Sequence, residues 1–469
     1  MNKEQSLDSN RLLVSAAADS SLAVELYNEI RDLPIISPHG HVDPSLFVRN
    51  QKFESPTDLF IYHDHYITRL LHADGVAMIE LRKPQTDADF AHAKNAWVKF
   101  FERWAMFAGT ASGYWFQESL QSVFGITEEP SNENALAIYE QIALELERDE
   151  MRPVELLKAF NIEFLATTDD PCDDLAAHAA LNSDATLSTR FAPTFRPDFY
   201  IDPVTEDWFA RVQKICSLTG QELSHLGLVE ALWFRRQFFK SQGAVSVDIG
   251  AATAFTTVLS DMEAEALFEK ARAGTISEAE ALLYRGNMIT EMVRMSCEDE
   301  LVITLHVGVH RNHSAPTLAK FGRDTGHDLP IQAEFVSNLQ PVLDLYGLNP
   351  NLTLILFSLD ESTWGREIAP LASFYPSVRI GAPWWFLDAP DSATRFREAT
   401  VEIAGFYRGS GFIDDTRAFL SIPARHDMAR RVEAAFLAKL VAQGRISVTT
   451  ARKIARDIVV SIPKRAFKL

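Results

Sequence analysis

Eight short apolar runs separated by helical patterns constrain the fold of this chain more than any other feature. The runs end in polar or glycine-containing sequence and span residues 34–42, 162–168, 188–195, 244–250, 301–309, 352–359, 378–386 and 411–416. Near-continuous apolar strands that alternate with helices indicate a buried parallel sheet. Eight such units predict an α/β fold, a distorted TIM-like (β/α)8 barrel, rather than an open doubly wound sheet.

The distance between the first two runs predicts an inserted subdomain. About 120 residues separate them, where a barrel needs only a helix and loops, and their aromatic and amphipathic content favours helices. We therefore expect three parts: residues 1–43 with an N-terminal helix and the first strand, 44–155 as a helical insertion, and 156–469 with the rest of the barrel and C-terminal helices. A length of 469 residues suits one large barrel with an insertion.

Several helix boundaries can be read from the chain. Ser260 with Glu263 and Ser277 with Glu280 are S-x-x-E capping boxes that open apolar-periodic segments. Residues 223–242 predict one long helix that ends at a glycine before the fourth run. Two further helices are expected at residues 426–442 and 449–462, where the chain closes the barrel.

The charge balance excludes several classes of partner. Lys and Arg total 45 against 64 Asp and Glu, a net charge of −19, so we expect no nucleic acid and no membrane surface as a partner. The chain has no run of eighteen apolar residues that could span a membrane. Three dispersed cysteines without a C-x-x-C motif fit a reducing cytoplasm, and a homo-oligomer is expected because large cytoplasmic enzymes are often symmetric assemblies.

Histidines and an aspartate at the ends of predicted strands indicate a metal site, because barrel active sites lie at these ends. His39 and His41 end the first run, and alternate residues of a strand face the same side. His306 lies near the end of the fifth run, and Asp415 ends the eighth. Imidazole and carboxylate ligands suit one divalent metal, with zinc preferred over manganese, iron or cobalt. The fourth run offers Asp248 but no bridging lysine, which argues for a single ion.

Simpler roles compete with metal binding at each position. His39 and His41 could be a structural pair, His306 a buried histidine bonded to a backbone carbonyl, and Asp415 the N-cap of the next helix.

A second set of residues at the strand ends indicates an anionic substrate. A guanidinium binds a carboxylate through two parallel hydrogen bonds, and four arginines follow predicted strands: Arg196, Arg311, Arg417 and Arg425. Trp384 and Trp385 could form a wall of the pocket and stack on a sugar, or simply pack in the core.

Taken together, these motifs resemble a known family. His39, His41, His306 and Asp415 resemble the metal site of the amidohydrolase superfamily. The segments PHGHVDP, HDHYITRLLHADGV, TTDDP, TFRPD, HVGVHRN, PWWF and DDTRAFLS resemble uronate isomerase (glucuronate isomerase), from about residue 20 to the C-terminus. The resemblance implies an aldose–ketose isomerase, an intramolecular oxidoreductase, that converts D-glucuronate to D-fructuronate and D-galacturonate to D-tagaturonate.

The resemblance also implies residue roles. The positions matching the family's metal site are His39, His41 and Asp415, with His306 beside them. The positions matching its substrate site are His65, Tyr66, Arg196, Arg311, Trp384 or Trp385, and Arg417.

The resulting mechanistic hypothesis is metal-assisted proton transfer from C2 to C1 through an enediol. Asp415, or a base that it positions, would carry the proton. Tyr66 and Arg417 would stabilise the enediolate, and Arg196 or Arg311 would anchor the C6 carboxylate. Two alternatives use the same residues: a metal-dependent hydrolase or decarboxylase, and a sugar-acid-binding protein without turnover.

Overall fold

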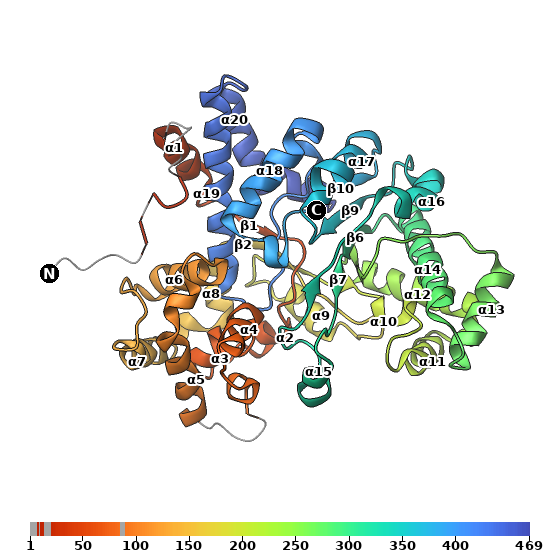
Figure 1. The fold of residues 1–469 in the computed structure, drawn as a ribbon, viewed down its shortest axis with the longest axis horizontal. Coiled ribbons are helices and arrows are strands. Elements are labelled where there is room, and N and C mark those ends of the chain that lie inside the picture. The colour runs from red at the N-terminus through yellow and green to blue at the C-terminus, as the bar shows by residue number, and fades with distance from the viewer. Residues whose placement is uncertain (1–6, 9, 14–19, 85–89) are drawn as a thin grey trace.

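The computed structural model describes residues 7–8, 10–13, 20–84 and 90–469 of a mixed α/β protein with parallel sheets (Figure 1). One sheet has the order β1-β2-β3, with β1 (Ile35–Ser37), β2 (Ile162–Ala166) and β3 (Arg190–Ala192). The other has the order β10-β9-β6-β5-β4, with β4 (Thr194–Phe195), β5 (Ser246–Ala251), β6 (Val302–Val307), β9 (Leu354–Ser358) and β10 (Val378–Ile380). A separate antiparallel pair joins β7 (Val309–His310) and β8 (Leu329–Pro330).

The prediction of a strand in the eighth run was wrong, because residues 411–416 form neither a helix nor a strand. Gly411 (φ 80°) and Asp415 (φ 41°) have left-handed backbones, which interrupt a β-ladder. Single hydrogen bonds still join this part of the chain to its neighbours: Ser410 N, directly before the segment, donates to Ile380 O at 2.9 Å, and His41 N donates to Thr416 O at 3.0 Å. The ladders of the described residues therefore form two parallel sheets rather than one continuous closed sheet.

The seventh run also departs from the prediction. Its strand ends at Ile380, and the tryptophans that follow enter a 3-10 turn, η5 (Trp385–Leu387). Pro383 has no N–H to donate to a ladder, and Trp385 has a φ of 49°. The chain therefore turns across the strand ends instead of continuing along the sheet.

Helices α9–α18 follow the strands, as a parallel sheet requires. They are α9 (Ala176–Ser183), α10 (Asp198–Ile201), α11 (Trp208–Thr219), α12 (His225–Ser241), α13 (Asp261–Arg272), α14 (Glu278–Asp299), α15 (Ala315–Phe321), α16 (Val336–Tyr346), α17 (Ala369–Phe374) and α18 (Pro390–Ala404). The long helix predicted at 223–242 is confirmed by α12.

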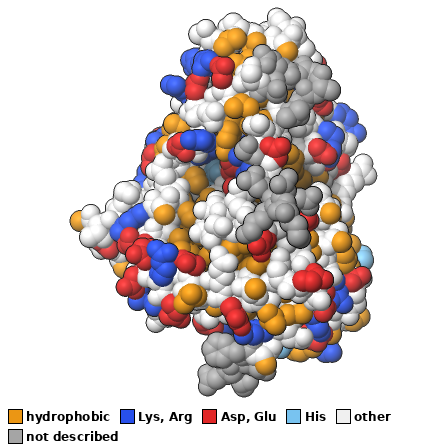
Figure 2. Space-filling view, turned by 90° about the vertical axis from the view of Figure 1, so that its left-hand side faces the viewer, with side chains coloured by type: hydrophobic (Ala, Val, Ile, Leu, Met, Phe, Trp, Pro, Cys, Tyr) orange, Lys and Arg blue, Asp and Glu red, His pale blue; other side chains and the backbone are white. Residues whose placement is uncertain are grey.

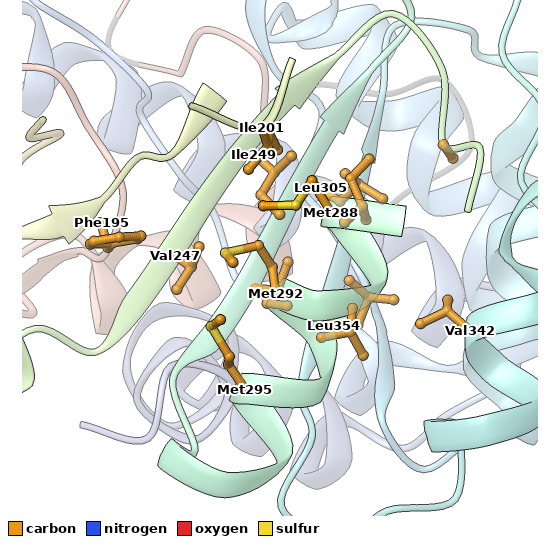
Figure 3. Close-up of a cluster of buried hydrophobic side chains, with 14 of the residues drawn as sticks. Phe195, Ile201, Val247, Ile249, Met288, Met292, Met295, Leu305, Val342 and Leu354 are labelled. Carbon is orange, nitrogen blue, oxygen red and sulfur yellow. The ribbon is translucent and has the colours of Figure 1, made fainter. Parts of the chain in front are cut away.

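The core between the five-stranded sheet and its helices follows from strand and helix periodicity (Figure 3). Val247 and Ile249, alternate residues of β5, face α14, whose Met288, Met292 and Met295 lie on one side of the helix. All five side chains are at most 1 % exposed, and full burial of one such side chain is worth about 1.5–3 kcal/mol. The residues between them in β5 consequently face the opposite side of the sheet.

The 120-residue spacer between β1 and β2 is helical, as predicted. It contains α2 (Ser45–Arg49), α3 (Pro56–Phe60), α4 (His65–Ala73), α5 (Phe90–Glu102), α6 (Ala111–Phe124), α7 (Ala135–Glu145) and α8 (Pro153–Ala159), with short 3-10 turns between them. Phe60, Trp97, Phe100 and Phe116 form its aromatic centre. The same cluster includes Phe191 of β3, so these helices pack against the three-stranded sheet.

Helices from the two ends of the chain pack together. α1 (Ser20–Ile30) lies against α19 (Ser421–Ala442) and α20 (Val448–Arg456) (Figure 1). α19 begins five residues before the predicted 426–442, and the segment predicted at 449–462 is α20, a π-helical turn and the start of α21 (Ile462–Ala466). None of the helices that the structure describes is long and apolar enough to cross a membrane, and Figure 2 shows acidic and basic side chains interspersed over one face.

Both predicted capping boxes are present, at the starts of α13 and α14. Each serine accepts a hydrogen bond from the N3 backbone N–H, while the glutamate at N3 accepts one from the serine N–H. We expect Ser260→Ala and Ser277→Ala each to lower the free energy of unfolding by about 1 kcal/mol, measured by urea denaturation. Ser241→Ala, which removes an exposed hydroxyl at the end of α12, should have a smaller effect; equal losses would contradict the capping argument.

Candidate active site

All twelve site residues expected from the sequence line one cavity of about 1110 Å³. They come from the loops that follow β1, β4, β7 and β10, from β6 itself, from η5, from residues 415–417 and from the helices α4 and α19. The residues are His39, His41, His65, Tyr66, Arg196, His306, Arg311, Trp384, Trp385, Asp415, Arg417 and Arg425. The structure therefore gathers residues from distant parts of the chain into one site.

Two histidines and one aspartate converge at the inner end of this cavity. Nε2 of His39 lies 3.3 Å, and Nε2 of His41 2.9 Å, from the same Oδ1 of Asp415. The segment between the histidines is held on both sides, because His41 N donates to Thr416 O and Thr168 Oγ1 donates to Gly40 O. One ligand atom from each residue lies within 4.8 Å of the others, a spacing that could hold a metal ion.

The protonation of Asp415 and His41 also suits a metal. Burial disfavours a charged Asp415, but His39 and His41 outweigh this and hold its pKa well below the usual range. Burial lowers the pKa of His41 to about 4, so the imidazole is neutral near pH 7. Burial also opposes protonation of His39, but Asp248 and Asp415 outweigh it and raise its pKa, so a metal there would compete with a proton.

His306 lies beside this group, in a second cluster that shares His39. Its Nδ1 is 2.7 Å from Oδ1 of Asp248, and its ring stacks 4.7 Å from that of His39. Its Nε2 is buried without a hydrogen-bond partner in the described part of the chain. Two imidazoles, a carboxylate and this unpartnered nitrogen are ligand types that divalent zinc, manganese, iron or cobalt accepts; the donor set therefore fits such an ion.

Asp248 is a site residue that the sequence did not assign, beyond noting it at the fourth run. It lies on β5 opposite Thr304 of β6, and alternation along both strands points Asp248 and His306 away from the helices. Burial opposes ionisation of Asp248, but Arg196 and His39 outweigh it and hold its pKa well below normal. The carboxylate therefore fixes the orientation of the His306 ring through Nδ1.

The four arginines differ in how far their charge is already neutralised. Arg196 is held by two carboxylates, with Nε 2.9 Å from Asp198 Oδ2 and Nη1 3.3 Å from Asp248 Oδ2. Arg425 is 3 % exposed and pairs with Asp388 Oδ2 at 2.6 Å. Neither has its full donor set available to a substrate.

Arg311 and Arg417 are the more accessible pair. Their side chains are 43 % and 45 % exposed, and each pairs with an aspartate, Arg311 with Asp328 at 3.0 Å and Arg417 with Asp324 at 3.3 Å. Both aspartates lie in the loop between α15 and β8, and the sequence pattern did not single them out. A substrate carboxylate could exchange with Asp324 at modest cost, because the Arg417–Asp324 pair is about half-exposed on both sides and exposed ion pairs are weak. Asp328 is 9 % exposed and also accepts from Asn312 N, so it stays in place beside Arg311.

Aromatic side chains form the wall between these groups. Trp384 is buried and packs edge-on against His306 at 4.6 Å, while Arg311 lies over the ring of Trp385 at 5.0 Å. Trp384 therefore supports the histidine and Trp385 the arginine at the mouth.

Burial and the charge of Arg417 lower the pKa of His65 to about 4, so its imidazole is neutral near pH 7.

A cavity in a parallel α/β protein, with histidines and an aspartate converging at the strand ends, is typical of a class of metal-dependent enzymes. The chain belongs to the glucuronate isomerase family, which it matches over residues 9–467, and it is an enzyme of the isomerase class. It is 44 % identical over 471 residues to the uronate isomerase of Corynebacterium efficiens, with all of both chains covered.

Solved structures agree with this assignment. The glucuronate isomerase from Caulobacter crescentus matches with a TM-score of 0.95 and 43 % identity, covering 99 % of this chain and 97 % of that one. The uronate isomerase from Thermotoga maritima matches with a TM-score of 0.92 and 28 % identity, covering 98 % and 99 %. The family expected from the motifs is thus confirmed.

Proposed function

We propose that the protein converts D-glucuronate to D-fructuronate and D-galacturonate to D-tagaturonate by transferring a proton from C2 to C1 through an enediol. The observation that carries this proposal is the convergence of His39, His41 and Asp415 on one point inside a cavity whose mouth holds two half-exposed arginines. His39, His41 and Asp415 would face the C1–C2 end of the sugar, and the two arginines would bind its carboxylate.

One divalent metal, with zinc preferred, would be held by His39, His41 and Asp415 with His306 beside them, and would polarise the oxygens at C1 and C2. Asp415 takes the proton from C2 and returns it to C1, which its ionised state allows. The hydroxyl proton on the C2 oxygen moves to the C1 oxygen in the same conversion, so that the C1 carbonyl becomes a hydroxyl and the C2 hydroxyl becomes the ketose carbonyl. The backbone of Asp415 is left-handed, and this turn directs its carboxylate toward the two imidazoles.

The arginine contacts favour different tasks for each cation. Arg311 is better placed than Arg196 to anchor the C6 carboxylate, because Arg196 is already held by two aspartates. Arg417 would stabilise the negative charge of the enediolate. The O–H of Tyr66 is donated to Asp388, so Tyr66 offers lone pairs to the cavity and would accept a hydrogen bond from the substrate hydroxyl at C2.

We propose that the two sheets belong to one distorted (β/α)8 barrel, closed through the 411–416 segment. The hydrogen bonds of this segment to Ile380 and His41 support this arrangement. Within it, residues 44–155 would be the inserted subdomain between 1–43 and 156–469. The cytoplasmic location and the homo-oligomeric state stay predictions from the sequence.

The proposed function predicts turnover that can be followed directly. Purified, zinc-loaded protein is incubated separately with D-glucuronate and D-galacturonate in D2O, and ketose formation and deuterium at C1 are followed by NMR. We expect ketose from at least one uronate, loss of turnover after chelation of the metal, and recovery when a divalent ion is restored.

Other outcomes would contradict the proposal. Release of CO2 or incorporation of a water oxygen into the product would indicate the decarboxylase or hydrolase instead. Binding of both sugars without conversion by the metal-loaded protein would indicate a sugar-acid-binding protein.

A further inference from the structure

A buried carboxylate lies behind the cavity, and the reaction proposed above does not use it. Asp388 follows η5, directly before the start of α18, and is only 4 % exposed. It does not line the cavity itself. Burying a carboxylate is costly unless both oxygens find donors, so the partners of Asp388 indicate what it holds in place.

Both oxygens of Asp388 are used, and both partners line the cavity. Tyr66 donates its hydroxyl to Oδ1 at 2.9 Å, and Arg425 donates from Nη1 to Oδ2 at 2.6 Å. Tyr66 comes from α4 of the inserted helices, whereas Arg425 comes from α19 near the C-terminus. One carboxylate therefore joins two separate elements at the edge of the site.

The rest of the surroundings leave both partners little freedom. Arg425 lies over the ring of Trp115 at 3.7 Å, and its Nε donates to Ser421 Oγ at 3.0 Å. The ring of Tyr66 packs edge-on against the same Trp115 at 5.6 Å. Packing does not determine the direction in which the Tyr66 O–H bond points, because a hydroxyl rotates toward whichever acceptor is present.

We propose that Asp388 is a positioning residue of the active site, which holds the Tyr66 hydroxyl and the Arg425 guanidinium so that Tyr66 faces the substrate as a hydrogen-bond acceptor. This inference rests on the proposed function. It assigns Asp388 no contact with the substrate, since its effect passes through Tyr66.

Replacing Asp388 by asparagine distinguishes a role in positioning Tyr66 from a purely structural role. An amide has one acceptor oxygen and one NH2 donor, and Arg425 can only donate. The amide oxygen must therefore face Arg425, and the NH2 group must face Tyr66, which reverses the direction of the Tyr66 hydrogen bond. Assays at pH 8.5 keep the wild-type carboxylate ionised, because burial raises the pKa of Asp388 to about 7 against the pull of Arg425.

We expect D388N to lower kcat about 10- to 100-fold, the range for losing a hydrogen bond to a charged group, with a smaller change in KM. Y66F should lower kcat strongly in the wild-type background but have little further effect in D388N, because residues that act as a unit are not additive. Wild-type kcat in folded D388N, or a full Y66F effect in both backgrounds, would overturn the proposal.

The matched control is D299N, which makes the same change in a buried Arg–Asp pair, Arg236 with Asp299, away from the cavity. It should lower stability but leave kcat and KM of the folded enzyme unchanged. If D388N does not fold, D388E keeps the charge and both acceptors but displaces them by one methylene. Positioning within about 0.5 Å then predicts a fall in kcat of about tenfold or more, and unchanged kcat in folded D388E would overturn the proposal.

Failure of the proposed function would be recognised separately, from the wild-type enzyme in the same assay. If the wild type converts neither uronate, calorimetric binding of D-glucuronate to wild type, D388N, Y66F and the double variant replaces kcat as the readout. The same non-additivity is then expected in Kd, and additive effects would overturn the inference.

Discussion

Asp415→Asn is expected to lower kcat about 10²–10⁴-fold, the range of a general base, while the protein stays folded. Asparagine keeps the shape of the side chain but cannot take a proton from carbon, and it removes the charge that both His39 and His41 face. The measurement is kcat on D-glucuronate and D-galacturonate at saturating divalent metal, with bound metal determined on the same sample. Full activity in this variant would remove Asp415 from the mechanism.

The neighbouring residue provides a matched control for that variant. Asp414 points away from the two imidazoles, and its Oδ2 lies 3.0 Å from Nε2 of His426. An asparagine oxygen can still accept this hydrogen bond, so Asp414→Asn should change kcat less than about tenfold, well below the range expected for Asp415. Equal losses in the two variants would mean that the whole turn, rather than the Asp415 carboxylate, is required.

Asp299→Ala is expected to lower the free energy of unfolding by about 3–5 kcal/mol, the cost of breaking a buried ion pair from one side. Arg236 is 0 % exposed, and its Nε and Nη2 donate to the two oxygens of Asp299 at 2.8 and 2.9 Å. Without the carboxylate, α12 and α14 enclose an uncompensated guanidinium. Urea denaturation of the variant and the wild type measures the difference.

Two comparisons test whether the loss in the free energy of unfolding comes from leaving a buried charge unpaired rather than from losing an ion pair as such. Replacing both partners, with Arg236→Met and Asp299→Leu, should recover most of the loss, because no buried charge is left unpaired. Glu361→Ala removes the partner of Arg395, which makes an equally bidentate but half-exposed pair at 2.7 and 2.8 Å, and should cost less than about 1 kcal/mol. A similar loss at both sites would contradict the burial argument.

The strands that the sequence predicted well are those in which local preference and burial agree. In β6 (Val302–Val307) every residue is buried, so an uninterrupted apolar run identifies the strand. The 411–416 run, GFIDDT, was also predicted to be a strand, but its glycine and Asp415 adopt left-handed backbones. A backbone conformation of that kind depends on the surrounding structure, so it could not be read from the run itself.

The residues of the candidate site also fall into those that the sequence could identify and those that it could not. His39, His41, His306, Asp415 and the arginines could be named because residue type and a place after a strand suffice to suggest them. Asp324, Asp328 and Asp388 could not, and Asp248 was noted only for its place at the fourth run, because acidic residues are common here, 64 Asp and Glu in all. Their roles depend on which arginine, histidine or tyrosine lies opposite, and those partners are distant in the chain.

By itself the sequence determined the alternation of parallel strands and helices, the family, and the chemical types of the residues at the strand ends. These depend on local periodicity and on motifs of a few residues. Only the tertiary structure decided that His39 and His41 meet Asp415 on one oxygen, that Arg196 is already neutralised, and that Asp388 holds Tyr66. Each of these depends on side-chain contacts a few ångströms long. The contacts of Asp415 and Asp388 join elements far apart in the chain, which packing of the whole core brings together.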